Sequence, residues 1–252
     1  MFCCISSGCL ANGISVAKIR DEDSYLPLTT ASIMGSLPIT FKDVSDLIRF
    51  AKEYLVENRL NSLDNDVKRC LTKNHKKEQL APFPAILYCF SVLDLLGSLY
   101  GGHARRGSTV ENTRIYMQKF MSTSGRKYED WQISLLQKIF RHKLVHLSEP
   151  KAVFLYDNKI IGWRHDEEDI DGKHHLQIRE VGEEELSADI FGRVIIKVDG
   201  EFVVSISKFK DEIIDSVKRD KNGYLAELEK NSPTSNKFVV AINQIFDTMI
   251  ID

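Results

Sequence analysis

The feature that most constrains the fold is a long apolar stretch, residues 85 to 100. Two prolines precede it and Gly101-Gly102 follow it. That order is typical of a helix, because proline fits the first turn and glycine ends the last one. The stretch is shorter than the roughly 20 apolar residues that a bilayer-spanning helix needs. We therefore expect a helix over 83–100 that forms the buried centre of a helical bundle.

The composition is that of a soluble globular protein. Of the 252 residues, 43% are hydrophobic and 28% are charged, which excludes disordered and fibrous classes. The length suits one large domain or two modest ones. The formal net charge is −2, so the chain does not coat nucleic acid by bulk electrostatics. Any contact with RNA must be local.

The first 38 residues are rich in Ser, Gly and Thr and are predicted to be a flexible leader. They lack the basic start and long apolar core of a signal peptide. Cysteines number five, and three of them crowd the N-terminus without a repeating spacing. We interpret them as reduced thiols of a cytoplasmic protein with no membrane partner. Cys3-Cys4 with Cys9 leave a metal or acylation site as an alternative.

Helical spacing of apolar residues continues on both sides of the central stretch. Thr40 is a candidate cap for the first helix, and Pro150 stops the last one. The predicted helices are 41–58, 63–74, 83–100, 109–121 and 128–147. Short links between them favour an antiparallel bundle over residues 39–150.

After Pro150 the apolar pattern changes from helical to alternating. Asp157-Asn158 and Asp199-Gly200 are each flanked by such segments, which is a strong signal for a tight hairpin. A further strand is expected near 175–181. Helical spacing then returns in 209–219, 224–228 and 237–250. The predicted fold class is mainly α with a β appendage (α+β): a helical bundle, then, within 151–252, a small antiparallel β-meander and C-terminal helices.

One segment near the end of the predicted helix 128–147 carries groups suited to phosphoryl chemistry. It reads Arg141-His142-Lys143-Leu144-Val145-His146. A histidine exchanges protons near neutral pH and can deprotonate a ribose 2′-hydroxyl. An arginine keeps its charge and can contact two phosphate oxygens as negative charge develops. The pair therefore predicts metal-independent cleavage of RNA, with no cofactor.

This segment resembles the Arg-x4-6-His motif of the HEPN superfamily, in which a polar residue commonly follows the arginine. The all-helical bundle of that family matches residues 39–150. Ser91 and Asp94 resemble the polar position that HEPN proteins often carry on an earlier helix facing the motif. Many relatives follow the histidine with glycine and an aromatic residue, whereas Leu147 and Ser148 stand here.

The resemblance implies a ribonuclease that forms a 2′,3′-cyclic phosphate in the cleft of a homodimer. Arg141 and His146 would be catalytic, with His142 and Asp94 assisting. Four polar residues are candidates for contacting the RNA substrate: Ser91, Arg105, Arg106 and Lys143. Members of the family often act as toxins or defence effectors, so an inhibitor or antitoxin protein is a possible partner.

Other interpretations of the same residues stay open. Cations near a helix C-terminus are also favoured by the helix dipole. His142 and His146, four residues apart, could present two metal ligands, but no glutamate follows His142 as the zinc-protease pattern requires. We expect no metal. The alternative function is a HEPN-like helical module without catalysis, which binds a nucleotide or a protein partner.

Overall fold

The computed structural model describes most of the chain after residue 37. The described ranges are 38–72, 81–104, 109–125, 127–142, 153–165, 176–180, 187–190 and 194–247. The chain divides into two units, Met1–Gly35 and Ser36–Asp252, and every described residue belongs to the second. The predicted leader lies outside the described residues, apart from Pro38.

Within the described residues the fold is mainly helical with a small sheet, so the α+β class is confirmed. The helical segments are α1 (Val44–Ala51), η1 (Lys52–Leu60), α2 (Asn61–Leu71), α3 (Pro82–Gly101), α4 (Thr109–Tyr116), η2 (Met117–Met121), α5 (Asp130–Leu136), η3 (Gln137–His142), α7 (Ile206–Lys218), α8 (Tyr224–Lys230) and α9 (Ser232–Phe246). The strands are β1 (Val153–Tyr156), β2 (Lys159–His165), β3 (Leu176–Glu180), β4 (Ser187–Ile190), β5 (Val194–Lys197) and β6 (Gly200–Val204).

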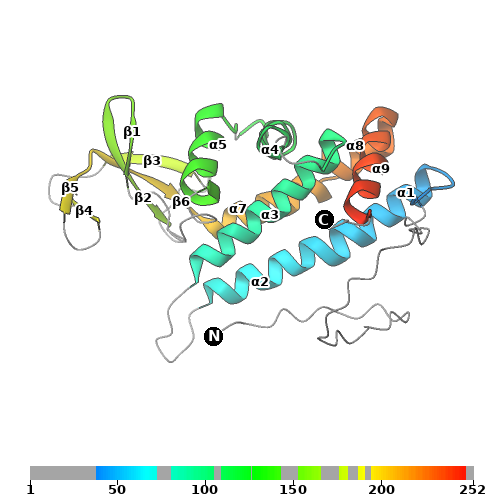
Figure 1. Ribbon diagram of the computed structural model, residues 1–252, viewed down its shortest axis with the longest axis horizontal. Helices are drawn as coiled ribbons and strands as arrows, with labels where there is room; N and C mark the ends of the chain where they lie inside the picture. Colours follow the sequence, from blue (N-terminus) through cyan, green and yellow to red (C-terminus); the bar gives the residue numbers. More distant parts are fainter. Residues whose placement is uncertain are drawn as a thin grey trace, which may run out of the picture. The chain divides into compact units, whose positions relative to one another are not determined.

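The first three helical segments form one continuous helix from Val44 to Leu71 (Figure 1), because the backbone stays right-handed helical at both junctions. The predicted break between residues 58 and 63 was wrong. Leu60 and Leu63 are both buried and carry the apolar stripe across this polar region. Asp43 caps the helix, in place of Thr40, by accepting a hydrogen bond from the backbone N–H of Asp46 at 2.8 Å.

The central helix α3 has the predicted bounds to within one residue. Gly102 ends it in the left-handed conformation, with φ at 83°, and donates its N–H to the Ser98 carbonyl. Among the described residues, α3 is the one helix that is long and apolar enough to cross a membrane. Its apolar side chains pack against α2, α4, α7 and α9, which lie around it (Figure 1). It is a core helix of the fold.

The predicted core helices 83–100 and 128–147 are neighbours, as α3 and α5–η3. Their buried side chains include Phe90, Leu93, Leu136, Ile139 and Phe140, and Leu87 is half-buried. Glu129 and Gln132 form a reciprocal capping box that begins α5. The described helix ends at His142, and the predicted part beyond it lies outside the described residues.

The four-stranded sheet has the order β1-β2-β6-β3 and is mixed. The hairpin at Asp157-Asn158 is confirmed: both residues have positive φ, 49° and 59°, as a two-residue turn requires. The predicted antiparallel meander was wrong, because β2 and β6 pair in parallel. Strand β5 does not form a hairpin with β6 at Asp199-Gly200 but pairs with β4 in a separate two-stranded sheet.

Asp199 gives the physical reason for this difference. Its backbone N–H donates to the Ile160 carbonyl at 2.7 Å, and its carboxylate accepts the Ile160 N–H at 2.6 Å. These two bonds attach the chain to β2 just before β6 begins. Asp199-Gly200 therefore starts a central strand and does not turn the chain back on β5.

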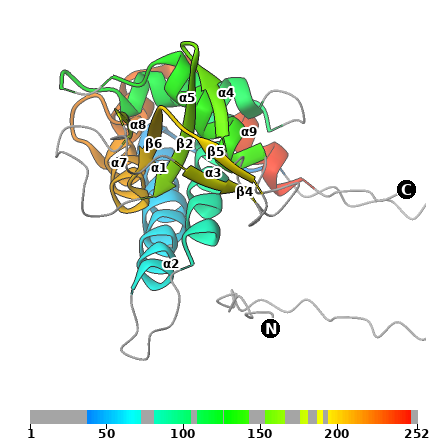
Figure 2. The same cartoon turned by 90° about the vertical axis from the view of Figure 1, so that its left-hand side faces the viewer.

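One hydrophobic core joins the helices and the sheet. It includes residues from both sides of position 150. Trp131 of α5 packs its ring on Tyr156 of β1 at 5.0 Å between centroids, and Phe140 of η3 packs on Trp163 of β2 at 5.3 Å. The helix that carries Arg141 therefore contacts the sheet directly, and the sheet lies beside α5 in Figures 1 and 2.

The C-terminal helices are confirmed, but two begin earlier than predicted. Ser205 caps α7 by accepting the Lys208 N–H at 3.2 Å. Asn231 caps α9 in the same way through the Thr234 N–H at 3.4 Å. Pro233, expected to precede the last helix, is part of its first turn, a position that tolerates proline because no intrahelical N–H bond is lost there.

Candidate functional site

The structure describes half of the eight predicted site residues. Lys143, His146, Arg105 and Arg106 lie outside the described residues. The structure describes the other four, which are Ser91, Asp94, Arg141 and His142. Ser91 and His142 are exposed. The side chains of Asp94 and Arg141 keep 25% and 20% of their surface exposed, so both remain in reach of a ligand.

Asp94 and Arg141 form an ion pair between α3 and η3. The guanidinium Nε and Nη2 donate to the same carboxylate oxygen, Oδ2, at 2.9 and 2.8 Å. The two residues are 47 positions apart in the sequence. The predicted polar residue of the earlier helix and the arginine of the motif are thus in direct contact.

This contact occupies only one edge of the guanidinium. Arginine has five N–H donors in a planar fork, and Asp94 takes two of them. No other described residue accepts a hydrogen bond from Arg141, so Nη1 and the second Nη2 hydrogen are unengaged within the part of the chain that the structure describes. Those donors form the edge that matches two oxygens of a phosphate group. Among the described residues, the guanidinium is thus oriented by one carboxylate, and a pair of its donors has no acceptor there.

The second oxygen of Asp94 has its own partner. The hydroxyl of Thr113, in α4, donates to Oδ1 at 3.0 Å. Thr113 is completely buried. Asp94 is therefore held through both carboxylate oxygens, by a neutral donor on one side and a cation on the other.

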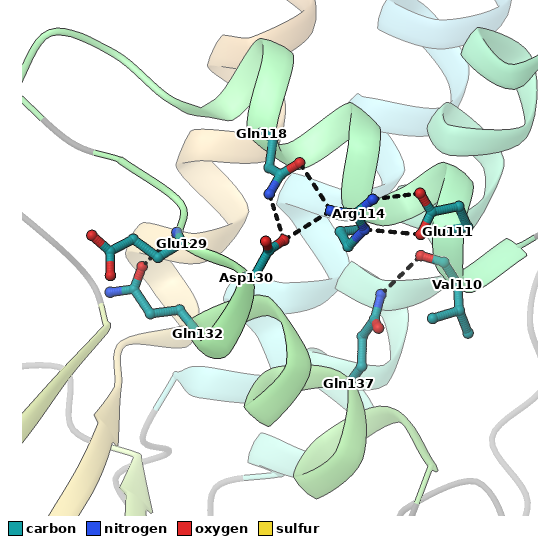
Figure 3. A network of polar contacts seen from close by, with 8 residues as sticks. All are labelled: Val110, Glu111, Arg114, Gln118, Glu129, Asp130, Gln132 and Gln137. Carbon is teal, nitrogen blue, oxygen red and sulfur yellow. Dashed lines mark hydrogen bonds and ion pairs between the residues drawn. The ribbon is translucent and has the colours of Figure 1, made fainter. Parts of the chain in front are cut away.

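A polar network attaches α4 to the start of α5 (Figure 3). Arg114 donates to Glu111 at 2.8 Å through Nε and to Asp130 at 2.8 Å through Nη1. Gln118 donates to the same Asp130 oxygen at 2.7 Å. Hydrogen bonds from Arg114 hold the pKa of the Glu111 and Asp130 carboxyl groups below their ordinary values. Both carboxylates therefore stay ionised and keep the link at neutral pH.

A second link lies next to the motif. Gln137, one helical turn before Arg141, donates through Nε2 to the Val110 carbonyl at the start of α4, at 3.2 Å (Figure 3). Gln137 is buried. The helix that carries Arg141 is thus connected to α4 at its first turn and again beside the candidate site.

Thr113, Arg114 and Gln137 were not predicted from the sequence. Gln137 had a detectable signal, because a buried-face glutamine four residues before Arg141 shares its side of the helix. Thr113 had none, since its partner Asp94 is 19 residues away. The contact of Arg114 with Asp130, 16 residues away, had none either. Of the described residues, no three His, Cys, Asp or Glu side chains lie close enough together to hold a metal ion.

Comparisons with known proteins found no relative of this chain. No family model, no curated protein and no solved structure matches it. The function is therefore inferred from the chain's own residues and from the resemblance of residues 141–146 to the HEPN motif.

Proposed function

We propose that the chain is a metal-independent endoribonuclease of the HEPN type, with residues 39–150 as its HEPN-like bundle. His146 removes the proton of a ribose 2′-hydroxyl, and the oxygen attacks the adjacent phosphorus. The bond from phosphorus to the 5′-oxygen breaks, and this leaving oxygen takes a proton from solvent. Arg141 stabilises the charge that develops on the phosphate oxygens, and His142 assists. The products are a 2′,3′-cyclic phosphate and a 5′-hydroxyl end. No metal or cofactor takes part.

The observation that carries the proposal is how the side chain of Arg141 is held. Its guanidinium is held through Nε and Nη2 by Asp94, while the opposite edge is unengaged by any described residue. An arginine fixed on one edge loses little further freedom when it binds a phosphate on the other. This is the arrangement that stabilisation of a phosphorane requires.

The remaining predicted residues complete the proposed site. Ser91 is exposed on α3, one turn before Asp94, and is proposed to contact the RNA backbone. Lys143, Arg105 and Arg106 supply local positive charge to a chain whose net charge is −2. We propose a cytoplasmic homodimer that acts as a toxin or defence effector and is held in check by an inhibitor protein.

One observation favours the alternative, a non-catalytic HEPN-like module. The charge of Arg141 is already offset by Asp94 at 2.8 Å, which weakens its attraction for a phosphate. A module that binds a nucleotide or a protein partner needs no more than this. The two functions share a fold and differ in whether RNA is cut.

The test is cleavage of mixed RNA by purified protein in EDTA, with the product ends identified. Wild type should cut and leave cyclic phosphates, and EDTA should not change the rate. His146→Ala should lower the rate by about 10² to 10⁴, the usual contribution of a general base. His165→Ala, in strand β2, is the matched control and should cut as fast as wild type. A folded wild type that cuts no RNA would rule out the enzyme and favour the binding module.

A further inference from the structure

We propose that Thr113 is a positioning residue of this site: its hydroxyl holds the Asp94 carboxylate, and that carboxylate orients the guanidinium of Arg141. The role of Thr113 in catalysis rests on the proposed function. Its role in orienting Arg141 does not, because that role follows from three described residues on three different helical segments.

The geometry requires a second anchor on Asp94. The terminal torsion of an aspartate is broad, so a carboxylate held at one oxygen can still rotate. Here Oδ2 accepts both bonds from Arg141, and Oδ1 accepts the Thr113 hydroxyl at 3.0 Å. Bonds at both oxygens fix the carboxylate plane. Without the Thr113 hydrogen bond, the carboxylate plane could rotate. The guanidinium edge that is proposed to bind a phosphate would then turn with it.

Thr113 itself cannot move away from Asp94. It is completely buried, and α4 crosses α3 at Gly97 with backbone against backbone. A Cβ atom on Gly97 would lie 2.7 Å from the Thr113 backbone nitrogen, which leaves no room for any other residue there. The glycine therefore sets the distance between Thr113 and Asp94, which lies three residues earlier in α3.

The same helix α4 also holds the helix of Arg141. Val110 accepts the Gln137 side chain at 3.2 Å, and Arg114 pairs with Asp130 at 2.8 Å. Within α4, Thr113 thus contacts α3, Arg114 contacts α5 and Val110 contacts η3. Of these contacts, the Thr113 hydroxyl is the one that reaches the ion pair itself. This makes it the contact whose loss changes the guanidinium orientation without separating the helices.

The expected effect is on turnover. Thr113→Val keeps the branched shape but removes the donor, so the helix contact is retained and the hydrogen bond is lost. We expect kcat to fall about tenfold with little change in KM, because a displaced group can cost up to about a hundredfold in rate. Thr113→Ser restores the hydroxyl and should recover most of the activity. A residue that served only packing would not be rescued by serine, the smaller side chain.

The experiment combines Thr113→Val with Asp94→Ala. If Thr113 acts through Asp94, Thr113→Val causes no further loss of RNA cleavage in the Asp94→Ala background. Equal losses in both backgrounds, or full activity of Thr113→Val while Arg141→Lys is impaired, would overturn the inference and leave the proposed function intact. If Arg141→Lys and His146→Ala both cut as fast as wild type, it is the proposed function that fails.

A measurement that does not depend on activity completes the test. The Nε–H proton of Arg141 is assigned in NMR spectra as the resonance missing from Arg141→Lys. Its exchange with water should be faster in Thr113→Val and in Asp94→Ala than in wild type or Thr113→Ser. Unchanged exchange in Thr113→Val overturns the inference even if wild type cuts no RNA. Thr113→Ala, which is smaller, replaces Thr113→Val if the valine variant does not fold.

Discussion

The side chain of Arg141 combines a planar shape with a permanent charge, and the proposed site depends on the shape. Both its bonds to Asp94 and its unengaged edge come from the guanidinium fork. Arg141→Lys keeps the charge but cannot make both contacts, so RNA cleavage should fall by about a hundredfold or more. Arg49→Lys, on an arginine whose side chain is 79% exposed, is the matched control. Equal rates for the two variants would contradict the role given to Arg141.

Tyr224 carries a buried hydroxyl group that has no hydrogen-bond partner among the described residues. Burial raises the pKa of Tyr224 well above its ordinary value. Tyr224→Phe removes the unpaired group and should raise the free energy of unfolding by about 1 kcal/mol.

A matched tyrosine provides the control for this prediction. Tyr116, which packs against Tyr224, has a hydroxyl 3.0 Å from the Ser216 hydroxyl. Tyr116→Phe breaks that buried hydrogen bond and should lower the free energy of unfolding by about 1 kcal/mol. Urea unfolding of both variants measures the two changes in the free energy of unfolding, which should have opposite signs. A loss of stability in Tyr224→Phe would show that its hydroxyl is hydrogen-bonded in solution.

At the scale of the elements, the crossing of α3 and α4 depends on Gly97. Alanine has the higher helix propensity, by about 1 kcal/mol, but its Cβ would meet the Thr113 backbone at 2.7 Å. Overpacking of this kind costs about 1 to 3 kcal/mol, so Gly97→Ala should destabilise the fold on balance. Gly125→Ala, where no atom lies within 4 Å of the new Cβ, should change stability little. Thermal unfolding compares the two; equal melting temperatures would contradict the close crossing.

Most of the elements could be predicted from the sequence because their signals are local. The turn at Asp157-Asn158 and the bounds of α3 depend on neighbouring residues, and both are confirmed. The parallel pairing of β2 and β6 could not be predicted, since it depends on Asp199 meeting Ile160, 39 residues away. A local turn signal at Asp199-Gly200 pointed to the wrong partner.

The candidate site shows the same limit. Arg141 was predicted from a short motif, and Asp94 from its resemblance to the polar position that HEPN proteins often carry on an earlier helix. Their contact, and the hydroxyl of Thr113 behind it, depend on how three helices cross. A threonine inside a helix carries no pattern that reports a partner 19 residues away.

At the scale of the whole molecule, Asp64 and Lys210 join the first long helix to α7. Lys210 is 4% exposed, and its ammonium lies 2.5 Å from Asp64 and 2.8 Å from Asp211. Hydrogen bonds from Lys210 and Lys68 lower the pKa of Asp64 below its ordinary value in the folded protein. Because the folded value is the lower one, this contribution to stability is complete above the unfolded pKa and is lost as pH falls through the folded value.

Asp64→Asn tests the link. At pH 7 the variant should unfold about 1 kcal/mol more easily, a modest loss because Asp211 remains beside Lys210. At pH 3 the difference from wild type should shrink. Urea unfolding at the two pH values measures both. A difference that grows as pH falls would mean that Asp64 does not bind Lys210 in its ionised form.

The position of α3 in the chain has a consequence for biosynthesis. A ribosome releases this most apolar helix early, yet α7 and α9, which cover it, follow only after the sheet. At about 5 to 20 residues per second, the chain takes on the order of 10 s to grow from Gly101 to Ser232. Throughout that interval the nascent chain presents an uncovered hydrophobic surface. The segment from Pro82 to Gly101 is therefore where a chaperone would engage the growing polypeptide.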